Sequence, residues 1–419
     1  MNRVELVLGD CLEELDKISD NSIDAIVTDP PYGLTSITKR FGKKGSAPAK
    51  YGNDGSFARL SKGFMGKEWD GSGIEYNVEL WEKCLRVLKP GGYLLAFGGT
   101  RTFHRIACAI EDSGFEIRDT IMWVYGSGFP KSMNIGLAID KKLGKESRVI
   151  GEGKSGVSSR AYQSEATTTA GAYQVKEAQN EWKGWGTALK PAYEPIIVAR
   201  KPFKGSLVDN VMENRVGGIN IDECRVGDEV VSIHNAPTGS FAGGEPGRGS
   251  DTNSYRDGVG RFPANLVLTY DETDKDEVCG GFPESKGGSG NAARYFYCAK
   301  ASRKDRDEGL EEFSIKTKVF NGKSDSSSKD IKDVEERFTT QLRNIHPTVK
   351  PTSLMQYLIR LVAPKGATIL DPFMGSGSTG KAVMYENKER GAEYSFIGIE
   401  KEKEYLEIAK ARINNVGEE

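Results

Sequence analysis

The stretch AIVTDPPYGL, residues 25–34, contains an apolar run that stops abruptly at an acid, two prolines and a tyrosine. The apolar run predicts a buried strand, and the two prolines prevent its continuation as either a strand or a helix. Asp29 is therefore expected at the carboxyl edge of a sheet, close to Tyr32. A second apolar run, in TILDPFMGSGSTGKA (368–382), also ends in Asp-Pro and continues into a glycine-rich turn. The two stretches together raise the question of which chemistry needs carboxylates at such strand ends.

Short apolar runs alternate with helical patterns in residues 1–125 and again near the C-terminus. This alternation predicts a mainly parallel sheet covered by helices on both faces. The long middle, roughly 126–345, is rich in Gly, Ser and Asn, and YEPIIVARK (193–201) is its one clear strand pattern. The chain is therefore expected to be an α/β protein with a long insertion.

Composition narrows the class of protein. The formal net charge of the 419 residues is −2, so an anionic partner would have to meet a local basic patch. The six cysteines form no CxxC pair and there are three histidines, which argues against a structural zinc site and a disulfide framework. No apolar stretch approaches the about 20 residues of a membrane span, and the N-terminal residues lack a signal-peptide pattern. We expect a soluble, intracellular protein.

The glycine-rich turn of residues 375–380 admits three interpretations. Its GxGxxG pattern, with Glu400 at the end of the next strand, fits a dinucleotide-binding turn. Lys381 also fits most of a phosphate-binding P-loop, but Ala382 stands where a Ser or Thr would bind Mg²⁺. The third interpretation is a turn that only lets a helix pack closely on a strand.

Asp371, at the end of the strand before these glycines, favours a different ligand. A carboxylate there would repel a pyrophosphate and attract a cation. S-adenosylmethionine carries an ammonium and a sulfonium and no phosphate, and Glu400 could accept hydrogen bonds from its ribose hydroxyls. The glycines would let the backbone approach its methionine part. Electrostatics therefore favours the methyl donor over NAD.

DPPY together with DPFMGSGST resembles the motifs of the amino-methyltransferases of DNA, which methylate the exocyclic nitrogen of adenine or cytosine. GDCLEEL, LKPGGYLLAFGG, HPTVKP and GIEKEKEYLEIAKARI are also similar to the family pattern. The resemblance covers the first ~200 and the last ~75 residues. DPPY precedes the long middle and the glycine turn follows it, an order that resembles the β arrangement of this family. GWGTALKPAYEPIIVARKPF and RYFYCAK resemble stretches of members carried by bacteria and their phages.

The resemblance implies a permuted Rossmann-like methyltransferase sheet of seven strands, mostly parallel, with an inserted target-recognition domain. We expect residues 1–201 to form the first part of the catalytic domain, with a mobile loop at 33–75. Residues 202–340 would form the target-recognition domain, and residues 341–419 the C-terminal part that carries the cofactor-binding loop.

The implied reaction is site-specific methyl transfer from S-adenosylmethionine to adenine N6 in double-stranded DNA by base flipping, as in restriction–modification. DPPY rather than SPPY favours adenine, and cytosine N4 is the closest alternative. An NAD- or ATP-binding protein without methyl transfer is the alternative from another class. The partner is double-stranded DNA, a homodimer is possible, and no membrane is involved. The expected location is the cytoplasm of a bacterial or phage-infected cell, near the nucleoid.

The expected catalytic residues are Asp29, Pro30, Pro31 and Tyr32. The resemblance implies that the Asp29 carboxylate and the Pro30 carbonyl accept hydrogen bonds from the two N–H groups of the target amine. Both acceptors would draw the nitrogen toward tetrahedral geometry and free its lone pair, and the prolines would hold their direction. Tyr32 would stack on the flipped base.

The cofactor would be held by residues around the glycine turn and by two further segments. Asp10 could accept from the adenine of the donor or could simply cap the helix after it. Thr348 and Lys350 in HPTVKP are expected near the methionine part, whereas His346 there could be only a polar turn residue. No metal ligands are expected. The full expected set is Asp10, Thr348, Lys350, Asp371, Pro372, Phe373, Gly375, Gly377, Ser378, Thr379 and Glu400.

Two segments are expected to contact DNA. Residues 33–68 contain eight basic and two acidic side chains, which suits a clamp on phosphates. The middle of the chain offers arginines for reading base edges. The expected DNA-binding residues are Lys39, Arg40, Lys43, Lys44, Lys50, Arg256 and Arg261.

Overall fold

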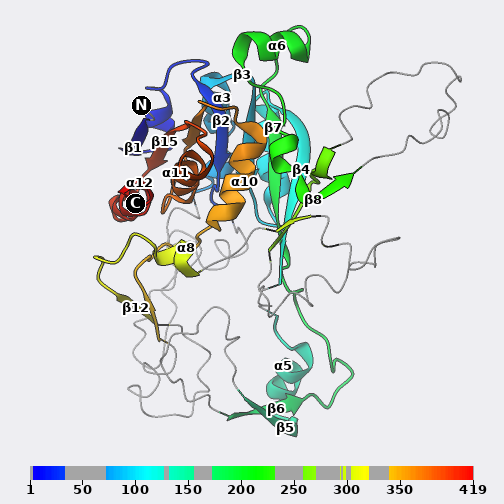
Figure 1. Ribbon diagram of the computed structural model, residues 1–419. Coiled ribbons are helices and arrows are strands. Elements are labelled where there is room, and N and C mark those ends of the chain that lie inside the picture. The colour runs from blue at the N-terminus through cyan, green and yellow to red at the C-terminus, as the bar shows by residue number, and fades with distance from the viewer. Residues whose placement is uncertain are drawn as a thin grey trace, which may run out of the picture. The chain divides into compact units, whose positions relative to one another are not determined.

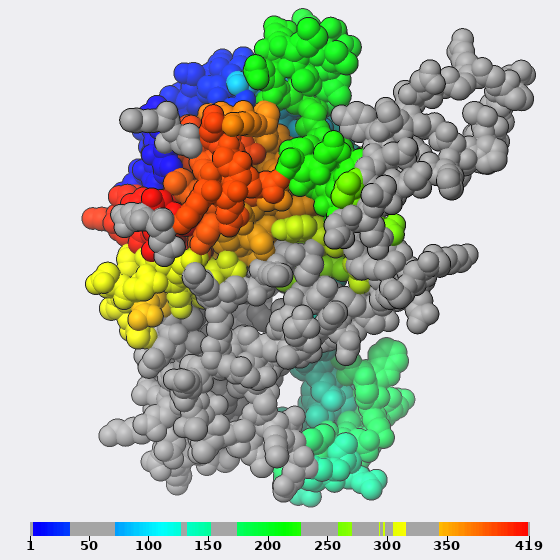
Figure 2. All heavy atoms as spheres, in the orientation of Figure 1, coloured from blue at the N-terminus to red at the C-terminus, as the bar shows by residue number. Residues whose placement is uncertain are grey.

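The computed structural model describes most of the chain, and the described residues are coloured in Figures 1 and 2. They are residues 3–33, 72–126, 132–154, 172–231, 258–269, 293, 296–298, 303–319 and 339–418. The chain forms two compact units. The first, here called the sheet unit, comprises Met1–Val124, Tyr193–Glu312 and His346–Glu419, and the second, here called the small unit, comprises Tyr125–Ala192 and Phe313–Ile345.

Nine of the described strands form one sheet in the sheet unit, in the order β1–β15–β14–β2–β3–β7–β4–β10–β11 (Figure 1). Their bounds are Val4–Leu8 (β1), Ile23–Thr28 (β2), Leu88–Phe97 (β3), Glu116–Tyr125 (β4), Tyr193–Arg200 (β7), Leu266–Thr269 (β10), Tyr297–Cys298 (β11), Thr368–Asp371 (β14) and Ser395–Glu400 (β15). The five neighbouring strands β1, β15, β14, β2 and β3 pair in parallel, and β7 lies antiparallel between β3 and β4. The expected α/β class with a mostly parallel sheet is confirmed.

The expected count of seven strands is too low. The first seven strands in the sheet order come from the segments that the sequence predicts as strands, and β10 and β11 extend this sheet beyond β4. Both come from the middle segment, which was expected to form a separate recognition domain. The described part of 202–312 therefore groups with the sheet, whereas 125–192 groups with the small unit.

The two Asp-Pro motifs lie on neighbouring strands. From β14 the chain passes through α11 (Ser378–Arg390) to β15 on one side, and from β2 it passes through α3 (Val78–Val87) to β3 on the other. Strands β14 and β2 are adjacent and parallel, so they form a topological switch point of the sheet. Ligands of open α/β sheets bind outside the carboxyl ends of strands at such a point.

Helices cover both faces of the sheet. Helices α1 (Cys11–Leu15), α3 and α4 (Phe103–Asp112) bury one apolar face each, in a core that also contains Ile26, Leu94 and Leu370 of the sheet. Helices α10 (Thr352–Val362) and α11 pack on each other and lie over the other face, and α12 (Lys403–Glu418) follows β15 (Figure 1). This burial of apolar side chains is the main stabilising contribution to the unit.

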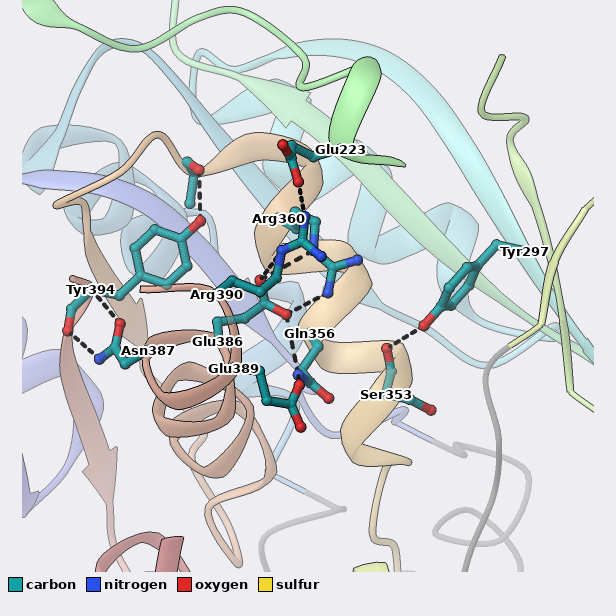
Figure 3. A network of polar contacts seen from close by, with 11 residues as sticks. Glu223, Tyr297, Ser353, Gln356, Arg360, Glu386, Asn387, Glu389, Arg390 and Tyr394 are labelled. Carbon is teal, nitrogen blue, oxygen red and sulfur yellow. Dashed lines mark hydrogen bonds and ion pairs between the residues drawn. The ribbon is translucent and has the colours of Figure 1, made fainter. Parts of the chain in front are cut away.

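A network of ion pairs and hydrogen bonds ties part of the middle segment to α10 and α11 (Figure 3). Glu386 of α11 is buried and accepts a hydrogen bond from Arg360 of α10, with Nε and Oε2 3.1 Å apart. Arg390 pairs with Glu223, which lies in the short helix η4 (Asp222–Cys224). The Tyr297 hydroxyl of β11 donates to a backbone carbonyl of α10 at 3.2 Å. These contacts account for the grouping of the middle segment with the sheet.

The remaining described elements are short. In the sheet unit they are η3 (Ile74–Tyr76), α6 (Leu207–Asn214), β8 (Val226–Val231), β9 (Gly258–Arg261) and α8 (Arg303–Asp307). In the small unit they are α5 (Ile135–Lys142) and two antiparallel strand pairs, β5 (Arg148–Lys154) with β6 (Ala172–Glu177) and β12 (Lys316–Val319) with β13 (Thr339–Leu342). None of the described helices combines the length and the apolar character needed to cross a membrane.

Candidate active site at the switch point

The backbone of the DPPY turn is held by side chains from two neighbouring elements. Strand β2 ends at Thr28, and the two prolines that follow Asp29 are buried. The Thr102 hydroxyl donates to the carbonyl of Tyr32 at 2.6 Å, and the Tyr76 hydroxyl donates to the carbonyl of Gly33 at 3.0 Å. Two side-chain hydrogen bonds therefore hold the backbone of the turn.

Of the two carboxylate oxygens of Asp29, one accepts a hydrogen bond from a described residue and the other does not. Lys350 Nζ lies 2.6 Å from Asp29 Oδ2, and the Lys350 side chain is 7 % exposed. Asp29 Oδ1 is screened from solvent and accepts no hydrogen bond from any described residue. A buried carboxylate oxygen without a donor costs free energy, and Oδ1 keeps its full capacity to accept a hydrogen bond.

Glu194, at the start of β7, completes this cluster. Its Oε2 accepts a hydrogen bond from the Tyr32 hydroxyl at 2.7 Å and lies 3.5 Å from Lys350 Nζ. Burial lowers the pKa of Lys350, but the two carboxylates outweigh it and the net pKa is raised, so the lysine is a cation. Burial and the same two carboxylates raise the pKa of Tyr32 well above its usual value. Sequence reasoning missed Glu194, although an acid at the start of a predicted apolar strand was a usable signal.

Two aromatic rings flank the ammonium of Lys350. Its Nζ lies 5.3 Å from the centroid of the Tyr32 ring and 4.9 Å from that of Phe97, which is fully buried. A cation over ring faces is favoured electrostatically, more so in a desolvated site. Lys350 was expected beside the cofactor, and the structure places its ammonium in the Asp29 cluster.

The glycine turn adopts backbone conformations that require glycine. Gly375 and Gly377 have φ values of +54° and +78°, which place both in the left-handed region. A Cβ on Gly380 would lie 2.5 Å from atoms of Phe396 and Ile413, so this glycine lets α11 pack on β15 and α12. The turn therefore combines a tight bend with close helix packing.

Asp371 links the two Asp-Pro strands. Its buried carboxylate accepts hydrogen bonds from the hydroxyls of Thr28 and Thr379 at 2.7 and 2.6 Å and from the Phe373 backbone N–H at 3.1 Å. Burial raises its pKa to about 6. Its expected role was the attraction of a cationic ligand, but these contacts make it a residue that positions the end of β2 and the start of α11.

Glu400 holds the glycine turn from the end of β15. It accepts hydrogen bonds from the backbone N–H groups of Gly375 and Glu402 at 2.8 and 2.7 Å. Burial raises its pKa to about 7. Each of its oxygens can still accept a second hydrogen bond, so the carboxylate can also bind hydroxyl donors of a ligand.

Asp10, at the neighbouring strand end, caps a helix. Its Oδ1 accepts from the Leu12 backbone N–H at 3.0 Å, and its Oδ2 lies 2.8 Å from Lys401 Nζ. The hydrogen bond and charge of Lys401 hold the pKa of Asp10 below its usual value despite some burial. The capping geometry that was expected as the alternative is thus present.

Lys381 does not point toward a ligand of the glycine turn. Its side chain is fully buried, and its Nζ lies 2.6 Å from Glu308 Oε2. A P-loop lysine must instead reach the phosphates that the turn binds. Arg412 donates to the backbone carbonyl of Ser376 from below the turn. Lys381 is therefore not placed as a P-loop lysine, which was the feature that suggested binding of a nucleoside triphosphate.

The residues of HPTVKP support the turn from a further side. The His346 ring packs closely against Gly375, because a Cβ added to Gly375 would lie 2.9 Å from His346 Nε2. Burial lowers the pKa of His346 to about 3, so its imidazole is neutral, and its Nδ1 donates to the Thr348 carbonyl at 2.5 Å. Thr348 itself is exposed. His346, expected to be a simple turn residue, backs the glycine loop.

Two other expected cofactor residues have ordinary positions, since Pro372 is buried and Ser378 begins α11. Arg261 is half-buried at the end of β9. The structure holds no candidate metal cluster of His, Cys, Asp or Glu among the residues it describes. The expected DNA-binding residues that lie outside the described residues are Lys39, Arg40, Lys43, Lys44, Lys50 and Arg256.

Comparison with known proteins shows the family of the chain. Residues 23–411 match the N6/N4 methylase family model, described as DNA methylase, so the chain belongs to this family. It is 27 % identical over 231 residues to the type II methyltransferase M.HindIII of Haemophilus influenzae, an alignment covering 51 % of this chain and 63 % of that protein. It is 47 % identical over 68 residues to M2.DpnII of Streptococcus pneumoniae, covering 16 % of this chain and 23 % of that protein.

Solved structures of methyltransferases also align with the whole chain. The crystal structure of M1.HpyAVI has a TM-score of 0.38 and 15 % identity, with 98 % of each chain covered. The PvuII DNA methyltransferase, described as cytosine-N4-specific, has a TM-score of 0.42 and 12 % identity, with 100 % of this chain and 91 % of that chain covered.

Proposed function

We propose that the protein transfers a methyl group from S-adenosylmethionine to the N6 amino group of adenine in double-stranded DNA. Family membership supports the class of reaction. The observation that carries the proposal is the state of Asp29, whose Oδ2 is paired with Lys350 while the buried Oδ1 has no donor among the described residues. A flipped base would bring that donor as an amino N–H.

Methyl transfer to an exocyclic amine depends more on hydrogen-bond acceptors for the amine than on a group that removes a proton. The lone pair of an exocyclic amine is conjugated into the ring, so the nitrogen is a poor nucleophile. Asp29 Oδ1 and the Pro30 carbonyl would accept its two N–H bonds and release the lone pair for attack. Both acceptors sit on a turn held by Thr102 and Tyr76, so little reorganisation is needed at the moment of reaction.

Lys350 and Glu194 would act through Asp29 and Tyr32. The ammonium of Lys350 pairs with Asp29 Oδ2 and so orients the carboxylate, with one oxygen directed at the lysine. Glu194 holds the Tyr32 hydroxyl and so sets the plane of the ring on which the base would stack. Lys350 and Glu194 are thus positioning residues in this scheme.

The residues around the glycine turn fit S-adenosylmethionine. The donor supplies an electrophilic methyl group on a sulfonium. Glu400 has acceptor capacity left for the ribose hydroxyls, and the left-handed glycines bring the backbone close to the ligand. The carboxylates of Asp10 and Glu400 lie at paired strand ends, since Leu8 is in register with Glu400. Buried Lys381 offers nothing to a phosphate, which disfavours ATP.

Three finer points belong to the same proposal. The DPPY motif favours adenine over cytosine by resemblance. Residues 33–68, with their basic excess, would clamp the DNA backbone, and residues 202–340 would contribute to target recognition. The catalytic segments would be 1–201 and 341–419.

The test is identification of the product. The protein is incubated with unmethylated genomic DNA and isotope-labelled S-adenosylmethionine, and the DNA is digested to nucleosides for mass spectrometry. The expected product is labelled N6-methyladenosine in its deoxy form. Labelled N4-methylcytosine would establish the alternative base instead. Donor binding by calorimetry without any labelled nucleoside would contradict methyl transfer to DNA.

A further inference from the structure

The small unit exposes two tryptophans on one tight turn. In the segment NEWKGWG (180–186), Trp182 is 41 % exposed and Trp185 is 59 % exposed. Their rings meet edge to face with centroids 5.3 Å apart. Leu189, 92 % exposed, and Met133, 50 % exposed, belong to the same unit. Such exposure of large apolar side chains needs a reason when the backbone beneath them is well ordered.

The side chain of Asn180 holds this turn. The Asn180 amide donates to the Gly136 carbonyl at 2.9 Å and to Asp140 Oδ1 at 2.7 Å, while its own oxygen accepts from the Trp182 N–H at 2.9 Å. The Ile135 N–H donates to the Trp185 carbonyl at 2.9 Å. The turn is thereby fixed to the first residues of α5, so the two rings are presented by a preorganised support rather than by a loose loop.

The surroundings of the turn are basic. Within residues 132–151 and 174–192, only Glu146 and Glu181 are exposed acids. Asp140 is buried at the Asn180 amide, and Glu177 pairs with Lys183 at 2.6 Å. The exposed basic residues of the same ranges are Lys141, Lys142, Lys145, Arg148, Lys176, Lys183 and Lys190. This surface would attract a polyanion although the whole chain is slightly acidic.

The chain connects this turn directly to the reaction site. The small unit leaves the sheet after β4 and returns at β7, and β7 runs antiparallel to β3, so its first residues lie at the carboxyl edge of the parallel strands. Glu194, which holds Tyr32, follows Trp185 by nine residues along the chain. The turn is thus joined through a short stretch of chain to a residue of the Asp29 site.

We propose that Trp182 and Trp185, together with the exposed basic residues of α5 and β6, form a surface that contacts the duplex being methylated. This inference rests on the proposed function. The lysines would neutralise phosphates, and the tryptophans would pack on the sugars of the backbone. The surface differs from the basic stretch 33–68 and from the segment 202–340.

The test measures duplex affinity with the full-length protein. Fluorescence anisotropy of a labelled mixed-sequence duplex is recorded over a salt series for wild type, W182A/W185A and W182F/W185F. We expect W182A/W185A to bind about tenfold more weakly because the apolar packing on the backbone is lost, and the phenylalanine variant to retain most of the affinity. The variant K141Q/K142Q should lower the salt slope by about 0.9 for each lost phosphate contact.

A matched control separates this surface from exposed apolar residues in general. Val208 and Met212 on α6 are 67 % and 79 % exposed and lie outside the small unit, so V208A/M212A should bind DNA like wild type. Circular dichroism and melting temperature confirm that each variant is folded.

Unchanged duplex affinity of a folded W182A/W185A would overturn the inference while leaving the proposed function intact, provided that wild type still methylates DNA. A change of oligomeric mass in W182A/W185A with unchanged duplex affinity would assign the surface to a protein partner and also overturn it. Wild type that neither binds nor methylates any duplex would contradict the proposed function itself.

Discussion

Lys350 Nζ lies 2.6 Å from Asp29 Oδ2, although the two residues are 321 positions apart in the chain. The pair joins the DPPY turn to the segment that leads into α10, next to the switch point between β14 and β2. A buried ion pair seldom adds much net stability, but removal of one partner leaves an uncompensated charge. The pair is best explained by orientation of the Asp29 carboxylate, with Oδ1 left for a substrate donor.

Replacement of Lys350 by methionine is expected to destabilise the fold and to slow the reaction. The uncompensated carboxylate of Asp29 should cost about 3 kcal/mol of unfolding free energy, near the lower end for broken buried pairs. The carboxylate would also lose its orientation, so kcat should fall by about a hundredfold or more. Urea unfolding and steady-state kinetics measure the two effects.

Lys365 provides the control for that variant. It pairs with Glu393 at 2.9 Å, but both side chains are about two-thirds exposed, at 66 % and 63 %. K365M should therefore change neither stability nor rate appreciably. If K350M behaved like K365M, the ion pair with Asp29 would have no role in positioning.

Glu194→Gln tests the second positioning residue. Glutamine can still accept from the Tyr32 hydroxyl, but it removes a negative charge near Lys350. We expect kcat to fall by roughly tenfold, the value of about 1.5 kcal/mol for a weakened hydrogen bond to a charged group. The KM for S-adenosylmethionine should change little, because Glu194 lies in the Asp29 cluster. Glu194→Ala should be worse than Glu194→Gln, and equal rates in the two variants would argue against the role.

The titration of Glu400 should be visible in stability. Its pKa is raised to about 7 by burial, so the folded state favours the neutral acid. The stabilisation that follows is complete below the ordinary pKa near 4.5 and is lost as the pH rises through 7. Asp371 acts in the same direction and stays in the variant, so the difference between wild type and E400Q isolates Glu400. Between pH 5 and pH 8, wild type should lose up to about 3 kcal/mol more than E400Q.

Glu400 should affect the binding of S-adenosylmethionine with a pH dependence opposite to its effect on stability. Ribose hydroxyls donate to the ionised carboxylate, so the affinity for S-adenosylmethionine should rise about tenfold from pH 6 to pH 8 as Glu400 loses its proton. Calorimetry should show a nearly flat profile for E400Q. A wild-type profile that is equally flat would remove Glu400 from the cofactor site.

Gly380→Ala tests the packing of the glycine turn. Alanine is normally favoured in a helix, but here its Cβ would lie 2.5 Å from atoms of Phe396 and Ile413. Overpacking should lower the unfolding free energy by about 1 to 3 kcal/mol. Gly218→Ala, where a Cβ meets open space, is the control and should change it by less than about 0.5 kcal/mol. A stabilised G380A would mean that α11 does not pack on β15 as closely as described.

Local patterns predicted the strand ends of the site. Asp29 and Asp371 follow apolar runs that end at proline, and both lie at the carboxyl ends of adjacent strands. The strand at 193–200 and the helix after the glycines were likewise readable, because their periodicity is strong. The class of fold and the position of the site follow from such short-range signals.

Contacts between residues far apart in the chain could not be predicted from the sequence. Glu194 meets Tyr32 across 162 positions, and although an acid at the start of an apolar strand is a signal, it does not identify Tyr32 as the partner. The sequence pattern also did not show that Asp371 accepts hydrogen bonds from two threonines. Strand β10 has only four residues, which is too short for a reliable period, so its addition to the sheet was missed.

Single-turnover methylation by Asp29→Asn tests the central claim most directly. Asparagine keeps the size of the side chain but loses the charge that pairs with Lys350 and weakens the acceptor at Oδ1. With donor and DNA prebound, we expect the rate of methyl transfer to fall by at least about a thousandfold, as for loss of a preorganised electrostatic contact. The affinity for S-adenosylmethionine should stay within about threefold of wild type, since Glu400 and the glycine turn are untouched. A folded D29N with a transfer rate near that of wild type would contradict the account.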